Sequence, residues 1–323
     1  MRKTLGINVS HHVSFAYFED DVLKEFYEED RFNKDKHFAP PNLFFHGPYE
    51  YLVLKKFKNI IFDTVLFSSA DKGDISIEKA IIDPILSQIK FKDMKFYLRE
   101  HHLFHALSGF YFSNFDEALC LICDGGGERY NFDYSYDSQS RFSVYESIYK
   151  INNHEIIEFY KHYSNARDDF FQGYNIFTKE LNSKKQNTDI KLSNKLCGGL
   201  KYMIYMDKAG FKPHQEGQMM GIAAYKDKNT NLDKDVLKIA HEAQEVTLQE
   251  RIKLIEKAMT YSNCKNIILS GGYHLNCANN FKLVKHFPKL NFFVDPIAHD
   301  AGTSIGNAYA HIKYKKNEKN FKN

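Results

Sequence analysis

The sequence lacks any apolar run of the roughly 18 or more residues that a membrane-spanning helix requires. Its N-terminus enters a strand-like stretch at once, with no apolar signal segment before it. Cysteine is scarce, with 5 thiols in 323 residues and no spacing typical of a metal site or a disulfide framework. An odd number of unpatterned thiols suits a reducing compartment. We therefore expect a cytoplasmic protein with no membrane partner.

A strong charge of either sign is also absent. The formal net charge is +3, so the charge balance does not demand a polyanionic partner. The composition is globular, with 43% hydrophobic and 26% charged residues. At 323 residues the chain is long enough to form two lobes, each with its own core.

Strand-like and helix-like patterns alternate along the chain. In the first part the pattern predicts strands at 4–9, 11–18, 22–28, 58–67 and 94–98, and a helix at 75–90. From residue 118 onward it predicts strands at 118–123, 142–149, 155–160, 266–270 and 290–294. Helices are expected at about 168–181, 192–209, 233–261, from 276 onward and at 301–312, and polar loops at 182–194 and 226–234.

The same order of elements occurs twice, from residue 4 and again from residue 118. Each time a strand runs into a glycine- or serine-containing turn and further strands follow. A repeat of this kind suggests two related lobes that face each other across a cleft. We expect residues 1–116 with 300–323 to form the first lobe and residues 117–299 the second.

The most informative stretch is 99–128, REHHLFHALSGFYFSNFDEALCLICDGGGE. His101 and His105 are four apart on a predicted helix, so their rings lie on one face and can converge. Asp124 ends a buried strand, on the side where open α/β sheets place their ligands. Two imidazoles and a carboxylate suit iron, manganese or zinc.

Three glycines, Gly125, Gly126 and Gly127, follow this aspartate and leave backbone N–H groups uncovered, as phosphate recognition requires. Alone, a histidine pair on an apolar helix is equally typical of core packing, and DGGG of an ordinary turn. Their occurrence together in one short unit favours a functional site.

Five motifs in order along nearly the whole chain resemble a known family. They are LGINVSHHVS, EEDRFNKDKH, the HHLFHA to DGGGE stretch, EGQMMGIAAY, and NIILSGGYHLNCANN with FFVDPIAHDAGTSIG. The chain resembles the N-terminal domain of the nodulation-factor, cephem and tobramycin O-carbamoyltransferases, which are related to the tRNA threonylcarbamoyl transferases. The resemblance implies an α/β, actin-like two-lobed ATPase (ribonuclease H-like) fold, each lobe a mixed sheet flanked by helices.

The resemblance also implies a ligand set for the metal: His101, His105, Asp124 and Asp300. Iron(II) is the favoured ion, with manganese or zinc as alternatives. Asp300 lies far along the chain, and the alternative role for it is the N-cap of the last helix.

Catalytic roles follow from the same resemblance. His12 is expected to take the proton of the acceptor hydroxyl, because an unshifted imidazole titrates near neutrality. Lys36 would neutralise phosphate or a developing oxyanion, the alternative being a solvated charge run. His102 points away from the other two histidines of the HHxxH pattern and would contact donor or acceptor.

Donor-binding residues are implied as well. Gly125, Gly126 and Gly127 resemble a phosphate-binding hairpin. Nucleotide contacts are expected from Gly271, Gly272 and Asn276. The EGxxMGxA motif, with Glu216, Gly217 and Gly221, is expected to border the cleft. Two positions depart from the family pattern: Val13 replaces a usual Asp, and Gln218 replaces a common Lys.

The predicted function is metal-dependent transfer of a carbamoyl group from carbamoyl phosphate or carbamoyl-adenylate to a hydroxyl. Relatives carry a C-terminal domain that makes carbamoyl-adenylate from ATP and carbamoyl phosphate. That domain is not expected here, so a separate protein is a candidate supplier.

The best hypothesis for the acceptor is the hydroxymethyl group of a modified cytosine in DNA, in a virus-encoded enzyme acting in the host cytoplasm. Lys184–Lys185, Lys226–Lys228 and the basic tail would contact phosphates, and aromatic side chains would stack a base. The alternatives are a small-molecule or sugar hydroxyl, a tRNA threonylcarbamoyl-type transferase, and a non-catalytic nucleotide-binding protein.

Overall fold

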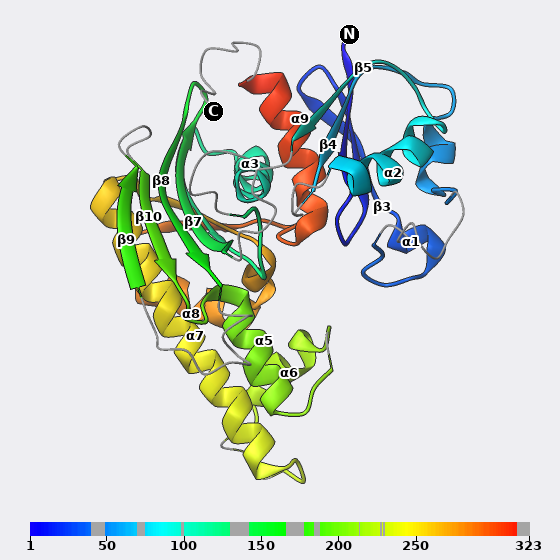
Figure 1. Ribbon diagram of the computed structural model, residues 1–323. Coiled ribbons are helices and arrows are strands. Elements are labelled where there is room, and N and C mark those ends of the chain that lie inside the picture. Colours follow the sequence, from blue (N-terminus) through cyan, green and yellow to red (C-terminus); the bar gives the residue numbers. More distant parts are fainter. Residues whose placement is uncertain are drawn as a thin grey trace.

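The computed structural model describes residues 1–39, 49–69, 75–97, 100–129, 142–165, 178–183, 188–212, 214–226, 228 and 230–314. Within these residues two β-sheets lie on either side of a pair of helices (Figure 1). Lys184, Lys185 and the tail 315–323, which the sequence assigned to phosphate contacts, lie outside the described residues. None of the described helices is both long and apolar enough to cross a membrane.

The first sheet has five strands in the order β3-β2-β1-β4-β5. They are β1 (Lys3–Asn8), β2 (Ser14–Glu19), β3 (Val22–Glu28), β4 (Ile61–Ser68) and β5 (Lys90–Tyr97). The first three form the expected antiparallel meander, while β4 runs parallel to both β1 and β5. A mixed sheet results, and its core is rich in aromatic rings such as Phe15, Phe57 and Phe62.

The second sheet has seven strands in the order β12-β11-β6-β7-β8-β10-β9. They are β6 (Glu117–Cys123), β7 (Ser143–Asn152), β8 (Ile156–Ser164), β9 (Thr178–Ser183), β10 (Thr188–Ser193), β11 (Asn266–Ser270) and β12 (Asn291–Val294). Strands β6, β11 and β12 are parallel, and β7 is antiparallel to its neighbours. Strands of the two sheets therefore come from 3–97 and 117–294, while the exact division into two lobes remains a prediction.

Two elements differ from the sequence-based expectation. The predicted loop at 182–194 is wrong at 182–183 and 188–193, which belong to the paired strands β9 and β10; residues 184–187 lie outside the described residues. The predicted helix at 168–181 is wrong at 178–181, which belong to β9, and its residues 168–177 lie outside the described residues. β10 is polar on one face only: Leu192 packs with Val144 and Tyr163, and Ile190 lies on the same side. The other face carries Asp189, Lys191 and Ser193, so the strand resembles a loop in composition.

The remaining helices flank the sheets. They are α1 (Asp30–Asn33), α2 (Ile75–Leu86), α5 (Gly198–Lys208), α6 (Glu216–Ala223), α7 (Lys234–Tyr261) and α8 (Cys277–His286), with 3-10 turns η1 (Val53–Phe57) and η2 (Gly272–Leu275). The long α7 begins where predicted, because the Asp233 carboxylate caps it by accepting from Asp235 N and Val236 N at 2.8 and 3.1 Å. The helix predicted at 192–209 begins later, at Gly198, because its first residues belong to β10.

The helix pair between the sheets consists of α3 (His101–Ser113) and α9 (Thr303–Lys313), the latter preceded by the 3-10 turn η3 (Asp300–Gly302). Helix α3 contacts β6, β7 and β11, whereas α9 contacts β1, β2 and β4 (Figure 1). The two helices touch backbone to backbone: a Cβ on Gly306 would lie 1.9 Å from Phe104 O. This close crossing brings the turn before α9 beside the first turn of α3.

We predict that Gly306→Ala lowers the free energy of unfolding by about 1–3 kcal/mol or more, because the added methyl group forces the two helices apart. Chemical denaturation measures the loss. Gly217→Ala on α6 is the matched control, since nothing lies within 4 Å of its Cβ position. The control should be neutral or slightly stabilising. Equal unfolding midpoints for Gly306→Ala and the wild type would contradict the helix crossing.

Candidate functional site

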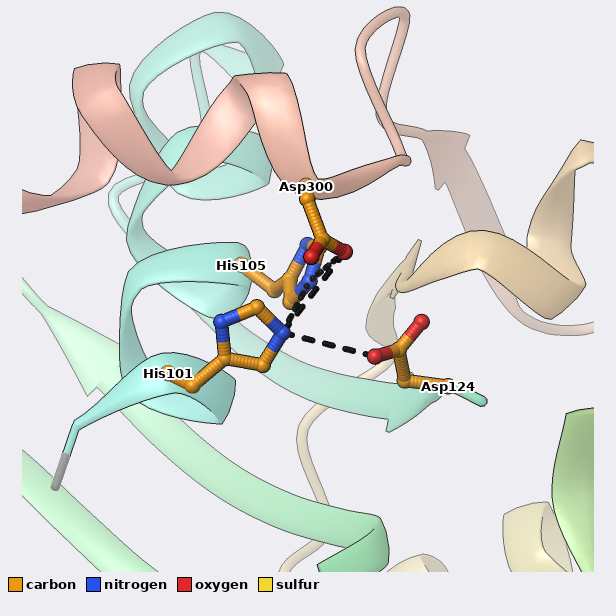
Figure 2. Close-up of side chains that lie close together, drawn as sticks. All are labelled: His101, His105, Asp124 and Asp300. Atoms are coloured by element: carbon orange, nitrogen blue, oxygen red, sulfur yellow. Dashed lines mark hydrogen bonds and ion pairs between the residues drawn. The ribbon is translucent and has the colours of Figure 1, made fainter. Parts of the chain in front are cut away.

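Four side chains from three distant parts of the chain meet between the sheets (Figure 2). His101 and His105 lie one turn apart at the start of α3, Asp124 follows the last residue of β6, and Asp300 opens η3. One ligand atom from each lies within 4.8 Å of all the others, and all four residues are buried. The ligand set implied by the resemblance is therefore brought together.

The ring Nε2 atoms of His101 and His105 face each other at 3.2 Å. Asp300 Oδ1 lies 3.6 Å from each of these nitrogens, and Asp124 Oδ2 lies 3.3 Å from His101 Nε2. Ligands bonded at about 2.0–2.1 Å to one ion lie roughly 3.0–3.4 Å apart when they are neighbours around it. The spacing and the two-imidazole, two-carboxylate donor set thus fit a divalent transition metal.

The electrostatics of the cluster also fit a cation. Burial disfavours a charged His101, yet the adjacent Asp300 and Asp124 carboxylates raise its pKa to about 9. Burial likewise opposes ionisation of Asp300, but His11 and His101 hold the pKa of its carboxyl well below the ordinary value. Two carboxylates are thus kept ionised inside the protein and require positive charge. A divalent ion bound here would supply it and would displace the histidine proton.

Neighbouring groups orient the two carboxylates. The Gly272 N–H donates to Asp124 Oδ1 at 2.9 Å, which leaves Oδ2 directed at His101. The hydroxyl of Ser10 donates to Asp300 Oδ2 at 3.1 Å, and His11 Nδ1 lies 3.2 Å from the same oxygen. Sequence analysis missed Ser10 and His11, although both belong to the VSHHVS motif; nothing in the motif distinguishes which histidine faces the carboxylate.

His12 lies beside this centre in a group of histidine rings. Its backbone is left-handed (φ 58°), and its Nε2 contacts His37 Nδ1. The His12 ring packs on His11 and His299 at centroid distances of 4.9 and 4.7 Å, and His37 stacks on His214 at 4.1 Å. His214 and His299 were not predicted. The fold brings His214 to His37 across 177 positions of the sequence, and His299 to His12 across 287.

The premise that His12 has an unshifted pKa is wrong. Burial, then the neighbouring His299 and His11, lower its pKa to about 3. The ring is therefore neutral at pH 7, and its Nδ1 is buried without a hydrogen-bond partner among the described residues. His12 can still accept a proton, and nearby negative charge would favour the imidazolium.

The other two predicted catalytic residues occupy different environments. Lys36 is exposed on the turn before His37, close enough for its charge to lower the pKa of His37 alongside burial and His214. His102 is fully buried and its Nδ1 lies 2.8 Å from Ser147 Oγ. Burial lowers the pKa of His102 to about 3, so its ring is neutral. The roles of both remain predictions.

The glycine turn after β6 is only partly free for phosphate. The Gly127 N–H donates to Val144 O at 2.9 Å, so it continues the β6–β7 ladder, and a Cβ there would lie 2.8 Å from the His102 ring. The expectation that all three N–H groups are uncovered is therefore wrong for Gly127. The N–H groups of Gly125 and Gly126 have no acceptor among the described residues.

The predicted nucleotide contacts in the SGGYHLN segment have partners inside the protein. Gly271 has φ 92°, and a Cβ there would lie 2.4 Å from Cys123 O, so it permits close packing on β6. The Gly272 N–H is engaged by Asp124. The Asn276 side chain caps α8 by accepting from Asn279 N and donates to Gln244 Oε1. Their contact with a nucleotide remains a prediction.

The EGxxMGxA motif forms α6. The carboxylate of Glu216 accepts from His214 N at 3.3 Å, which fixes the turn that carries His214. Gly217 and Gly221 lie exposed on one face of the helix, with open space around their Cβ positions. The motif thus adjoins the histidine group through His214, and its part in donor binding remains a prediction.

We predict that His101→Ala and Asp300→Asn each abolish metal loading. Purified protein would be loaded anaerobically with iron(II), freed of excess ion and analysed for metal content. The wild type should retain about one ion per chain and the variants less than a tenth of that, because each variant loses one of the four protein donors. His311→Ala is the control: this histidine is buried on α9 and faces Tyr97 Oη at 3.5 Å instead of the cluster. Full loading of either ligand variant would contradict the assignment.

Solved structures similar to this chain support the predicted fold. Full-length HypF in its phosphate- and nucleotide-bound form matches with a TM-score of 0.56 and 11% identity, over 98% of this chain and 56% of that one. A ROK family protein from Streptococcus pneumoniae matches with a TM-score of 0.52 and 10% identity, over 99% of this chain and all of that one. The likeness confirms the two-lobed, actin-like α/β fold.

Curated proteins similar in sequence include the nodulation protein NolNO of Sinorhizobium fredii, 24% identical over 80% of this chain and 38% of that protein. Uncharacterised proteins of Synechocystis and Methanocaldococcus jannaschii are each 25% identical over 95% of this chain and 56% of their own length. The chain thus spans about half the length of these relatives or less. The family described as carbamoyltransferase N-terminus matches residues 19–309, nine-tenths of the chain, and therefore the chain belongs to the carbamoyltransferase N-terminus family.

Proposed function

We propose that this chain is a metal-dependent O-carbamoyltransferase that moves a carbamoyl group from carbamoyl phosphate or carbamoyl-adenylate to a hydroxyl. The observation that carries the proposal is the buried cluster of His101, His105, Asp124 and Asp300 in a member of the carbamoyltransferase N-terminus family. Neither helix packing nor solubility explains two ionised carboxylates buried against two imidazoles. Iron(II) is the ion we propose, with manganese or zinc as alternatives.

A divalent ion held by these four side chains would supply a Lewis acid for the oxygen atoms of the donor. The chain's own residues perform the rest of the reaction. His12 accepts the proton of the acceptor hydroxyl on Nδ1, because its Nε2 is occupied by His37. The negative charge of a phosphate-bearing donor stabilises the imidazolium that forms.

Donor phosphate is bound in this proposal by the free N–H groups of Gly125 and Gly126, which lie directly after the ligand Asp124. Lys36 adds a cation from the turn that carries His37. Phosphate leaves if the donor is carbamoyl phosphate, and AMP leaves if it is carbamoyl-adenylate. Carbamoyl-adenylate has two proposed sources. Either a separate protein supplies it, or it is formed from ATP at this site.

The acceptor we propose is the hydroxymethyl group of a modified cytosine in DNA. Lys226 and Lys228 are exposed after α6, and the Lys228 ammonium lies 5.2 Å from the centre of the Tyr225 ring, itself 46% exposed. Exposed lysines with an aromatic ring suit contact with phosphate and a stacked base. A sugar or other small-molecule hydroxyl is the second candidate, since the histidine group requires only an alcohol.

Two other classes fit less well. A tRNA threonylcarbamoyl-type transferase shares the metal-binding histidine pair but not the HHLFHA and SGGYHLNC contexts of this sequence. A non-catalytic nucleotide-binding protein on this fold has no need for the buried histidine and carboxylate cluster.

The proposal predicts carbamoyl addition when the iron(II)-loaded protein is incubated with carbamoyl phosphate and ATP, or with carbamoyl-adenylate, and a panel of hydroxyl acceptors. The panel includes DNA with hydroxymethylcytosine, the free nucleoside and sugars, and mass spectrometry detects the product. Addition that needs both metal and a hydroxyl acceptor supports the function. Transfer to sugars alone would contradict the DNA acceptor, and no transfer with any donor would contradict the function.

We further predict that His12→Ala lowers the rate of transfer by about 10²- to 10⁴-fold, because the proton acceptor is lost. The bound metal should stay at the wild-type level, since His12 is not a ligand. His154→Ala is the control, because this histidine is exposed in the β7–β8 turn. A His12→Ala enzyme that transfers at the control rate would exclude His12 as the base.

A further inference from the structure

A buried arginine on α7, Arg251, has no part in the proposed reaction. Its side chain is 1% exposed, and it is the largest fully buried side chain among the described residues. Burying a guanidinium is costly unless its charge and its N–H donors are satisfied. The structure must therefore offer strong partners around it.

The partners of Arg251 come from three segments. One guanidinium nitrogen forms an ion pair with Glu146 on β7, and the other donates to Cys123 Sγ at 2.6 Å. The face of the Tyr273 ring lies 5.3 Å from the guanidinium carbon, within range for a cation–π interaction. Glu146 is held in turn by His162 Nδ1 at 3.0 Å. Arg251 thus ties α7 to β6, to β7 and to η2.

Two of these partners flank the metal ligand Asp124. Cys123 directly precedes it in the chain, and Tyr273 directly follows Gly272, whose N–H donates to Asp124 Oδ1 at 2.9 Å. The two segments already touch, because Gly271 lies so close to Cys123 that a Cβ would be 2.4 Å from its carbonyl oxygen. Arg251 belongs to α7, which packs on the face of β6 opposite α3, because Leu119 and Leu121 pack with α7 and Cys120 and Ile122 pack with α3.

We propose that Arg251 is a positioning residue for Asp124: by holding β6 and η2 together, it keeps the Asp124 carboxylate where Oδ2 faces His101 and the ion. The inference rests on the proposed metal-dependent function and goes beyond it. Groups behind metal ligands commonly change metal affinity by about 10- to 100-fold when removed. An arginine suits this position because its fork donates to two partners at once.

The test measures metal affinity and ligand geometry. Wild-type chain, Arg251→Met and Arg251→Lys would be titrated with cobalt(II), whose visible absorption reports the ligand arrangement. Arg251→Met should bind cobalt(II) about 10- to 100-fold more weakly and with an altered spectrum. Arg251→Lys, which keeps the charge but has a single donor centre, should recover part of the affinity.

Loss of stability is separated from loss of position by two further variants. Ile255→Ala, one turn along α7 and fully buried in the core beneath the second sheet, destabilises the protein without removing a hydrogen-bond or ring partner of Cys123 or Tyr273, and should keep wild-type affinity and spectrum. The Arg251→Met variant can fail to fold because Glu146 is left buried without its arginine. In that case the double variant Arg251→Met/Glu146→Gln, which also removes the glutamate charge, is titrated instead.

If Arg251→Met binds cobalt(II) with wild-type affinity and spectrum, the positioning role of Arg251 is wrong, while the proposed function stands. An equal loss of affinity in Ile255→Ala also contradicts that role, since the effect would then follow stability. A wild-type chain that binds no cobalt(II) or iron(II) contradicts the proposed function, and the inference fails with it.

Discussion

The burial of two ionised carboxylates beside two imidazoles is the constraint on which the rest of this structure depends. Asp124 and Asp300 are 5% and 2% exposed, and each opposes the ionisation of the other. Such a pair is unfavourable unless positive charge lies between them. In the chain alone that charge is a proton on His101, and in the proposed enzyme it is a divalent ion.

The fold solves this constraint by bringing three chain segments to one point. The close crossing of α3 and α9 at Gly306 places η3 beside the first turn of α3. The end of β6 arrives from the second sheet, fixed by η2 on one side and by the buried Arg251 behind it. The packing of α3 against α9, and of η2 and Arg251 against β6, thus determines the distances between the ligand atoms.

Local sequence patterns predicted the site residues that lie close together in the sequence. The spacing of His101 and His105 on a helix, and Asp124 at a strand end, follow from periodicity alone. Asp300 required the resemblance, because no local pattern separates a ligand from a helix cap. His214 was missed because only the tertiary fold brings it to His37. Ser10 and His299 were missed although each lies within two residues of a predicted site residue in the sequence.

Energetic properties were the least predictable from sequence. The pKa of His12 depends on burial and on rings from distant segments, so an unshifted value was the wrong expectation. Gly127 was expected to be free, but hydrogen bonding to β7 continues past Cys123, where the apolar run ends, and uses the Gly127 N–H. Strands β9 and β10 were missed because the sequence from 178 to 193 is mostly polar, whereas the long α7 was found where expected.

The measurement that tests this account most directly is anomalous X-ray diffraction from crystals grown with iron(II), recorded on both sides of the iron absorption edge. The account predicts one anomalous peak within bonding distance of His101, His105, Asp124 and Asp300. Well-ordered side chains at this position with no peak between them, at full iron supply, would contradict it.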